Sequence, residues 1–219
     1  MIKKMLIISF VLLFVFFICP AVFSAQEPQE LKLLKPQIEG GRPLMQALME
    51  RKSSREFSSE KLPLQVLSNL LWAADGVNRP DSGKRTAPSA VNWQNIDIYA
   101  AMADGLYLYD PLGHTLKLIL KDDIRAATGK QDFVKDVPLD LIYVADFSKI
   151  NRGTDEEKNF YSAAHTGFIS QNVYLYCASE GLATVVRGLV DREAMAKVMK
   201  LRPDQKVILA QSVGYPKKQ

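Results

Sequence analysis

The chain has 219 residues, 28 of them Lys or Arg and 24 of them Asp or Glu, which gives a formal net charge of +4 at pH 7. This near balance of charge, without a basic stretch interleaved with aromatic residues, argues against a nucleic-acid partner. The 2 cysteines and 2 histidines supply too few ligands for a typical metal centre, so we expect no metal site.

Residues 1–24 have the form of a secretory signal peptide, with a basic start, a long apolar run and Val22 and Ser24 suitably placed before the expected cleavage point. The alternative is an uncleaved membrane anchor formed by residues 6–23, although Pro20 interrupts the apolar run. We therefore expect an exported, periplasmic or otherwise extracytoplasmic protein, with membrane anchoring as the alternative.

Residues 25–42 are polar and contain prolines and paired glycines, which predicts an extended arm without a core of its own. A single domain is expected over residues 43–219. Two amphipathic helices should open this domain, at residues 43–51 and 63–75, and a long loop at residues 77–94 should follow them. Leu44, Ala47 and Leu48 are expected on one face of the first helix.

Alternating apolar patterns and short turns predict mostly antiparallel strands in the rest of the domain. The expected strands cover residues 95–102, 106–109, 115–120, 139–147, 182–187 and 207–215. Short helices are expected at residues 122–127 and 191–200. Helices and strands are mixed without regular βαβ repetition, so the predicted fold class is α+β, with a mostly antiparallel mixed sheet packed on a long central helix.

The long central helix is predicted between Thr154 and Gly181. Thr154 and Glu157 have the spacing of a capping box, and Gly181 suits the left-handed conformation that ends many helices. No charged residue occurs between Asn159 and Ser179, so the helix is expected to be surrounded by protein. A membrane span is disfavoured because several polar side chains would lie in lipid. Close approach of a second subunit is expected at the small residues Ala163, Ala164 and Gly167.

A phosphate-binding pattern follows the first helix, where Arg51, Lys52, Ser53 and Arg55 bring cations and a hydroxyl group into one short run. Arginine offers a planar pair of donors to a phosphate, and serine hydroxyls can complete its hydrogen bonds. The alternative is a solvated basic helix end, which needs no ligand. The pattern alone leaves both interpretations open.

Four segments, in this order over about residues 43–216, resemble the flavin-dependent nitroreductase family. The first, RKSSREF, resembles the family's RxSxRxF segment. This resemblance implies that Arg51, Ser53 and Arg55, with Lys52 as an addition, hold the phosphate and ribityl chain of FMN.

The second segment, APSAVNWQ, resembles the family's PSxxNxQ loop, which implies that Pro88, Ser89, Asn92 and Gln94 border the isoalloxazine ring. The third comprises the end of the central helix and the strand after it. The resemblance there implies that backbone faces the flavin edge at Val186, Arg187 and Gly188. The fourth, GYPKK, places Lys217 near the phosphate, with an exposed basic end as the alternative.

The resemblance implies an FMN-dependent oxidoreductase that passes hydride or electrons through the flavin to a small-molecule electron acceptor. It also implies a homodimer with shared sites and an electron donor that is NAD(P)H or, for an exported protein, a membrane redox partner. No catalytic side chain is assigned, because the flavin carries the chemistry. The alternative is a non-catalytic exported module that binds flavin or another ligand on the same fold.

Overall fold

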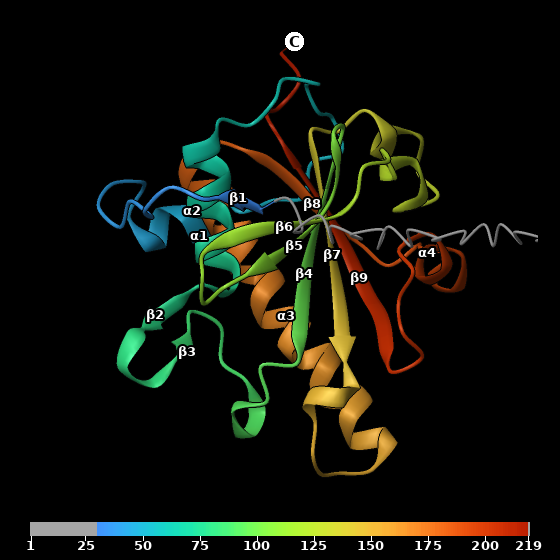
Figure 1. Cartoon of the computed structure of the whole chain (residues 1–219). Helices are drawn as coiled ribbons and strands as arrows, with labels where there is room; N and C mark the ends of the chain where they lie inside the picture. The colour runs from blue at the N-terminus through green and yellow to red at the C-terminus, as the bar shows by residue number, and fades with distance from the viewer. Residues whose placement is uncertain (1–29, 219) are drawn as a thin grey trace, which may run out of the picture.

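The computed structural model describes residues 30–218, so the expected signal peptide and the first residues of the arm lie outside it. A seven-stranded sheet in the order β1-β6-β5-β4-β7-β9-β8 forms the centre of the molecule (Figure 1). Every neighbouring pair in this sheet is antiparallel. Its strands are β1 Glu30–Lys32, β4 Ile96–Met102, β5 Gly105–Asp110, β6 Thr115–Leu120, β7 Leu139–Asp146, β8 Ala183–Arg187 and β9 Gln205–Gly214.

Helices cover both faces of the sheet. The long helix α3 (Asp155–Glu180) and helix α2 (Leu64–Asp75) pack on one face, and α4 (Arg192–Val198) packs on the other. Side chains of a strand alternate between the two faces, so Leu141 and Tyr143 of β7 join the first core while Ile142 and Val144 join the second. This explains the nearly continuous apolar sequence of β7 and confirms the predicted α+β class.

Helix α3 begins and ends where the sequence predicts. The Thr154 hydroxyl accepts from the Glu157 N–H at 3.2 Å, and the Glu157 carboxylate accepts from the Thr154 N–H at 2.8 Å. Gly181 ends the helix with a φ of 72°. One face of α3 is nevertheless uncovered within the chain, since Phe160 is 66% exposed and Phe168 is 46% exposed. The expectation of a helix surrounded on all sides therefore does not hold for one chain by itself.

The other candidate span, in the leader, lies outside the described part of the chain. Within residues 30–218, no helix has both the length and the apolar character that crossing a membrane would require.

Helix α1 (Leu44–Glu50) forms as predicted but turns most of its apolar face outward. Ala47 is buried, whereas Leu44 is 62% exposed and Leu48 is 43% exposed. Most of this face is therefore uncovered in the isolated chain. Periodicity identified the face, but it does not reveal what the face contacts.

Three further elements differ from the sequence expectations. The arm contributes β1, which pairs with β6 at the sheet edge, and Leu33 packs against the core. The expected loop at 77–94 contains a small hairpin of β2 (Val77–Arg79) and β3 (Lys84–Arg85), which turns at Gly83 with a φ of 60°. The helix expected at 122–127 is only a 3-10 turn, Arg125–Ala127.

Candidate functional site

The basic segment 51–57 lies along the outer edge of β8. The Ser54 N–H donates to the Thr184 carbonyl at 2.9 Å, and the Lys217 N–H donates to the Glu56 carbonyl at 3.2 Å. The segment is therefore held between an edge strand and the C-terminal residues. This arrangement brings Lys217 to the same region as the predicted phosphate-binding residues.

Tyr174 of α3 connects three of the predicted residues, although no sequence motif predicted a role for it. Its hydroxyl accepts the Val186 N–H at 2.9 Å and lies 2.8 Å from the Ser53 hydroxyl. The Arg51 guanidinium stands over the Tyr174 ring, 5.2 Å from its centre. Because the Tyr174 oxygen already accepts one hydrogen bond, its own proton can be donated to Ser53. One side chain thus aligns two predicted phosphate residues with the strand predicted at the flavin edge.

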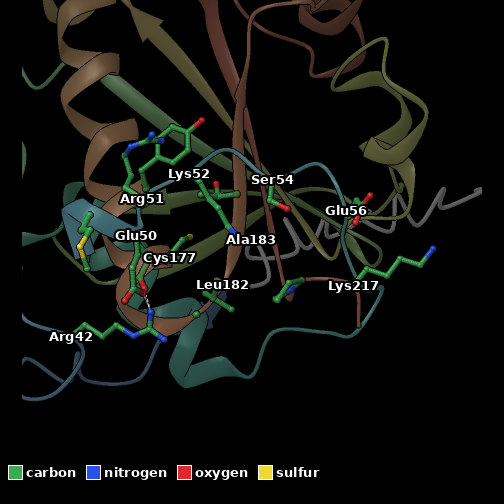
Figure 2. A pocket seen from close by; sticks show the side chains of 16 residues that line it. Arg42, Glu50, Arg51, Lys52, Ser54, Glu56, Cys177, Leu182, Ala183 and Lys217 are labelled. Atoms are coloured by element: carbon green, nitrogen blue, oxygen red, sulfur yellow. Dashed lines mark hydrogen bonds and ion pairs between the residues drawn. The ribbon is translucent and has the colours of Figure 1, made fainter. Parts of the chain in front are cut away.

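A cavity of about 620 Å³ opens beside this segment, between it and the C-terminal end of α3 (Figure 2). Arg51, Lys52 and Lys217 line the cavity, and none of them has a carboxylate at ion-pair distance within residues 30–218. Two carboxylates, Glu50 and Glu56, also line the cavity, and Glu50 forms an ion pair with Arg42. The wall therefore carries an excess of positive charge, which fits a phosphate group.

The side chains of the basic segment do not all reach one cavity. Lys52 and Ser54 line the large cavity, whereas Ser53 points to Tyr174. Arg55 lines a neighbouring depression, together with Phe57 and Lys217. The predicted set is therefore divided, because Arg51 lines the large cavity together with Lys52, Ser53 contacts Tyr174, and Arg55 lies in the neighbouring depression.

The second predicted group forms a compact loop with internal hydrogen bonds. The Ser89 hydroxyl accepts the Gln94 N–H at 2.8 Å, and the Gln94 amide donates to the Asn92 side chain at 3.1 Å and to the Gly83 carbonyl at 2.9 Å. Pro88 and Asn92 are exposed. Ser89 and Gln94 thus shape the loop, and Asn92 is the member that faces outward.

His165 of α3 joins this loop to the long helix. The Ala90 N–H donates to His165 Nε2 at 2.7 Å, and His165 Nδ1 lies 2.8 Å from the Asn95 side-chain oxygen. Because Nε2 accepts, the proton sits on Nδ1 and is donated to Asn95. Burial lowers the pKa of His165, which favours this neutral form. No sequence motif predicted a role for this histidine.

The two predicted groups do not meet within one chain. Tyr174 lies about two and a half helical turns beyond His165, which separates them by about 13 Å along α3 and places them on opposite sides of the helix. No residue of the loop at 88–94 lines the large cavity beside Arg51. A site that used both groups would need a second copy of the chain.

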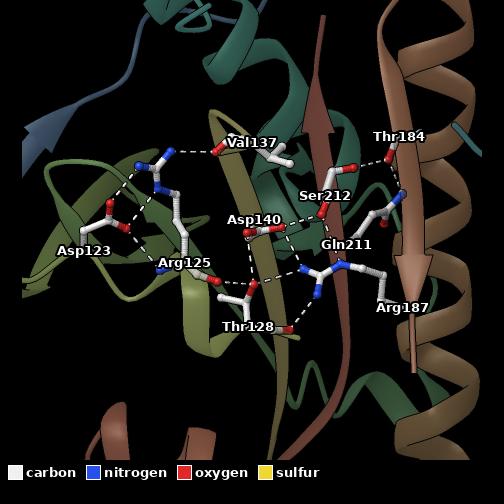
Figure 3. A network of polar contacts seen from close by, with 9 residues as sticks. All are labelled: Asp123, Arg125, Thr128, Val137, Asp140, Thr184, Arg187, Gln211 and Ser212. Atoms are coloured by element: carbon white, nitrogen blue, oxygen red, sulfur yellow. Dashed lines mark hydrogen bonds and ion pairs between the residues drawn. The ribbon is translucent and has the colours of Figure 1, made fainter. Parts of the chain in front are cut away.

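The side chain of Arg187, another predicted residue, points away from the cavity beside Arg51. It points to the sheet face opposite α3, where it donates to Asp140 at 2.7 Å, to the Ser212 hydroxyl at 3.0 Å and to the Thr128 carbonyl at 2.7 Å (Figure 3). Its exposure is 3% and that of Asp140 is 0%. The side chain is therefore structural, and only the backbone of Arg187 is left for a ligand. Val186 and Gly188 flank it, half-buried and exposed respectively.

Comparison with known proteins gives consistent matches over most of the chain. A sequence model described as the Nitroreductase family matches residues 48–215. A Methanocaldococcus jannaschii protein named "putative nitroreductase" is 32% identical over 169 residues, which cover 73% of this chain and 85% of that protein. A crystal structure from Ralstonia eutropha with the same description is 45% identical, with a TM-score of 0.83, over 87% of this chain and 90% of the other.

A more distant structure adds information on the fold. The Desulfovibrio desulfuricans protein, described as a nitroreductase in complex with FMN, is 19% identical with a TM-score of 0.59. The match covers 81% of this chain and 88% of that one. At this identity the likeness concerns the fold alone.

Proposed function

Because the chain belongs to the nitroreductase family, we propose that it is an FMN-dependent oxidoreductase that passes hydride or electrons to a small organic acceptor. The observation that carries this proposal is the cluster of cations beside Tyr174, where Arg51, Lys52 and Lys217 face one cavity. Bound FMN would supply the redox chemistry, and the protein would supply binding, orientation and electrostatics.

Different residues would bind different parts of FMN. Arg51, Lys52 and Lys217 would hold the phosphate by charge-assisted hydrogen bonds, and Arg55 would reach it from the neighbouring depression that it shares with Lys217. Ser53 would be held in position by Tyr174. The backbone of Val186 and Gly188 would face the edge of the ring. Asn92 would contact the ring from the loop at 88–94, because its side chain is exposed and the hydrogen bond from Gln94 to its amide oxygen orients it.

A homodimer follows from the separation of these two groups. The loop at 88–94 of one copy would complete the site beside Arg51 of the other copy. The exposed apolar faces of α1 and α3 support this arrangement, since Leu44, Met45 and Phe160 each lie more than half exposed to solvent in one chain. Each copy would then contribute to both sites.

The location and the electron donor are also part of the proposal. The signal peptide expected at residues 1–24 supports export of the protein across the membrane. Soluble reduced nicotinamide is scarce there. We therefore propose that the protein accepts hydride slowly from NADH or NADPH in vitro, and that a membrane redox partner is the cellular donor. Cell fractionation, paired with anaerobic flavin reduction by NADH, NADPH and a quinol, tests this part. Cytoplasmic protein reduced quickly by a nicotinamide would contradict it.

An absorption spectrum of thoroughly dialysed protein tests the function itself. The proposal requires a flavin spectrum that a reductant bleaches and that an added nitroaromatic or quinone restores. Flavin that stays bound but does not pass electrons to any acceptor would instead indicate a non-catalytic binding module. Protein that neither retains nor rebinds FMN would contradict both.

A further inference from the structure

The loop at 88–94 has an unfavourable backbone conformation. Val91, Asn92 and Gln94 have φ values of 52°, 56° and 46°, in the left-handed region that residues other than glycine rarely adopt. Val91 is β-branched, so its cost is the greatest of the three. Such a conformation persists only where surrounding contacts hold it.

His165 provides the hydrogen bond that holds this loop to α3. The Ala90 N–H, immediately before the left-handed residues, donates to His165 Nε2 at 2.7 Å. The imidazole is itself fixed, because its Nδ1–H donates to Asn95, whose amide donates to the Ser162 hydroxyl at 2.8 Å. His165 is 2% exposed, so water cannot easily replace either contact.

The groups that face the imidazole are uncharged in this arrangement. Tyr161 of α3 stacks on the ring with centroids 6.3 Å apart, and Trp93 of the loop meets it edge-on at 6.3 Å. Asn95, just before β4, completes the shell. Among residues 30–218, no carboxylate or cation hydrogen-bonds to the ring or forms an ion pair with it. A proton added to Nε2 would therefore find no acceptor in place of the Ala90 N–H that now donates to it.

We propose that His165 is a positioning residue whose neutral imidazole holds the loop at 88–94, and that proton uptake at Nε2 releases this loop. On protonation both ring nitrogens become donors, so the Ala90 N–H and the new Nε2–H face each other and the hydrogen bond is lost. The loop then relaxes from its left-handed conformation. Any effect of this loop release on a bound flavin rests on the proposed function, in which the exposed side chain of Asn92 contacts the ring.

The direction of the pH effect follows from burial. The pKa of His165 is lowered from its usual 6.5, so the native protein binds fewer protons than the unfolded chain just below pH 6.5. The loop contact is therefore complete above the unfolded pKa and is lost as the pH falls through the lower native pKa. Acidification should open the loop before it unfolds the domain.

Amide hydrogen exchange of residues 90–94 tests the inference in the purified full chain without any flavin. We compare wild type, His165→Gln and His165→Ala between about pH 7.5 and pH 5, with rates normalised to an unstructured peptide at each pH. The side chain introduced by His165→Gln would offer an amide oxygen to the Ala90 N–H but does not titrate. Wild type should lose about tenfold of its protection on acidification, His165→Gln should keep its protection, and His165→Ala should be unprotected throughout.

Two controls keep the outcomes separate. Protection of β7, which is buried on both faces, should stay constant over the same range and shows that the domain remains folded. Proton NMR of the His165 ring should give a titration midpoint that coincides with the loss of loop protection. Unchanged wild-type protection through that midpoint, or an equal acid loss in His165→Gln, would overturn the inference. A failure to bind FMN would contradict the proposed function and leave this exchange result unaffected.

Discussion

The hydroxyl groups of Tyr174 and Ser53 lie 2.8 Å apart, although one belongs to the long helix and the other to the basic segment after α1. The same Tyr174 oxygen accepts the N–H of Val186 in the edge strand β8. Three parts of the chain that are distant in sequence therefore meet at one phenol group. This contact gives the candidate phosphate region a fixed geometry before any ligand binds.

Tyr174→Phe should weaken FMN binding by about tenfold, because a lost hydrogen bond with an unpaired partner costs about 1 to 2 kcal/mol. The ring and its contact with Arg51 remain in this variant. Tyr176→Phe is the matched control, since its hydroxyl donates to the Val66 carbonyl of α2 at 3.3 Å and does not reach the segment. Fluorescence titration with FMN gives the affinities. Equal losses in both variants would count against a specific role for Tyr174.

Arg51→Ala and Arg55→Ala should each weaken FMN retention by about tenfold or more, because a charge-assisted hydrogen bond contributes about 1.5 to 3 kcal/mol. Arg152→Ala removes an exposed arginine near the other end of α3 and serves as the control. Retention is measured as flavin content after extended dialysis. Variants that remain as yellow as wild type would show that neither arginine binds the phosphate.

Arg187→Met should destabilise the domain by about 3 to 5 kcal/mol without changing FMN affinity per folded molecule, because it leaves Asp140 buried and unpaired. Replacing Asp140 by Leu in the same chain should recover part of this loss. Denaturant unfolding and FMN titration measure the two properties separately. A variant with normal stability and lost flavin affinity would indicate that the Arg187 side chain binds the flavin.

Burial raises the pKa of Asp75 from 3.8 to about 6, although Arg85 lies 2.5 Å away. The native protein therefore binds more protons than the unfolded chain between these values, and this group lowers the unfolding free energy as the pH rises through that window. Asp75→Asn should remove up to about 1.4 kcal/mol per pH unit of this slope. Exposed Asp81→Asn is the control, and an unchanged slope in Asp75→Asn would reject the assignment.

The sequence predicted the elements whose signals are local. Thr154, Glu157 and Gly181 fixed both ends of α3, and alternation located the strands. The contacts of Ser53 with Tyr174 and of Ala90 with His165 join residues far apart in the chain, so no short pattern reveals them. Strand β1 escaped prediction because its short polar sequence gains its structure only by pairing with β6.

The orientation of side chains was also beyond the sequence. Val186 and Arg187 are neighbours, but alternation sends Arg187 to the face of the sheet where Asp140 lies. In the same way, periodicity grouped Leu44 with Ala47 and gave no information on which of them the chain would cover. Knowledge of the strand order, or of a second subunit, would have been needed in each case.

In the proposed dimer, two copies of the chain share FMN sites, each built from the Arg51 cluster of one copy and the loop at 88–94 of the other. Sedimentation velocity at micromolar concentration, followed at the visible absorbance of the flavin, tests it most directly. All bound flavin should sediment with a species of twice the mass of one mature chain. Flavin that sediments with a clean monomer would contradict it.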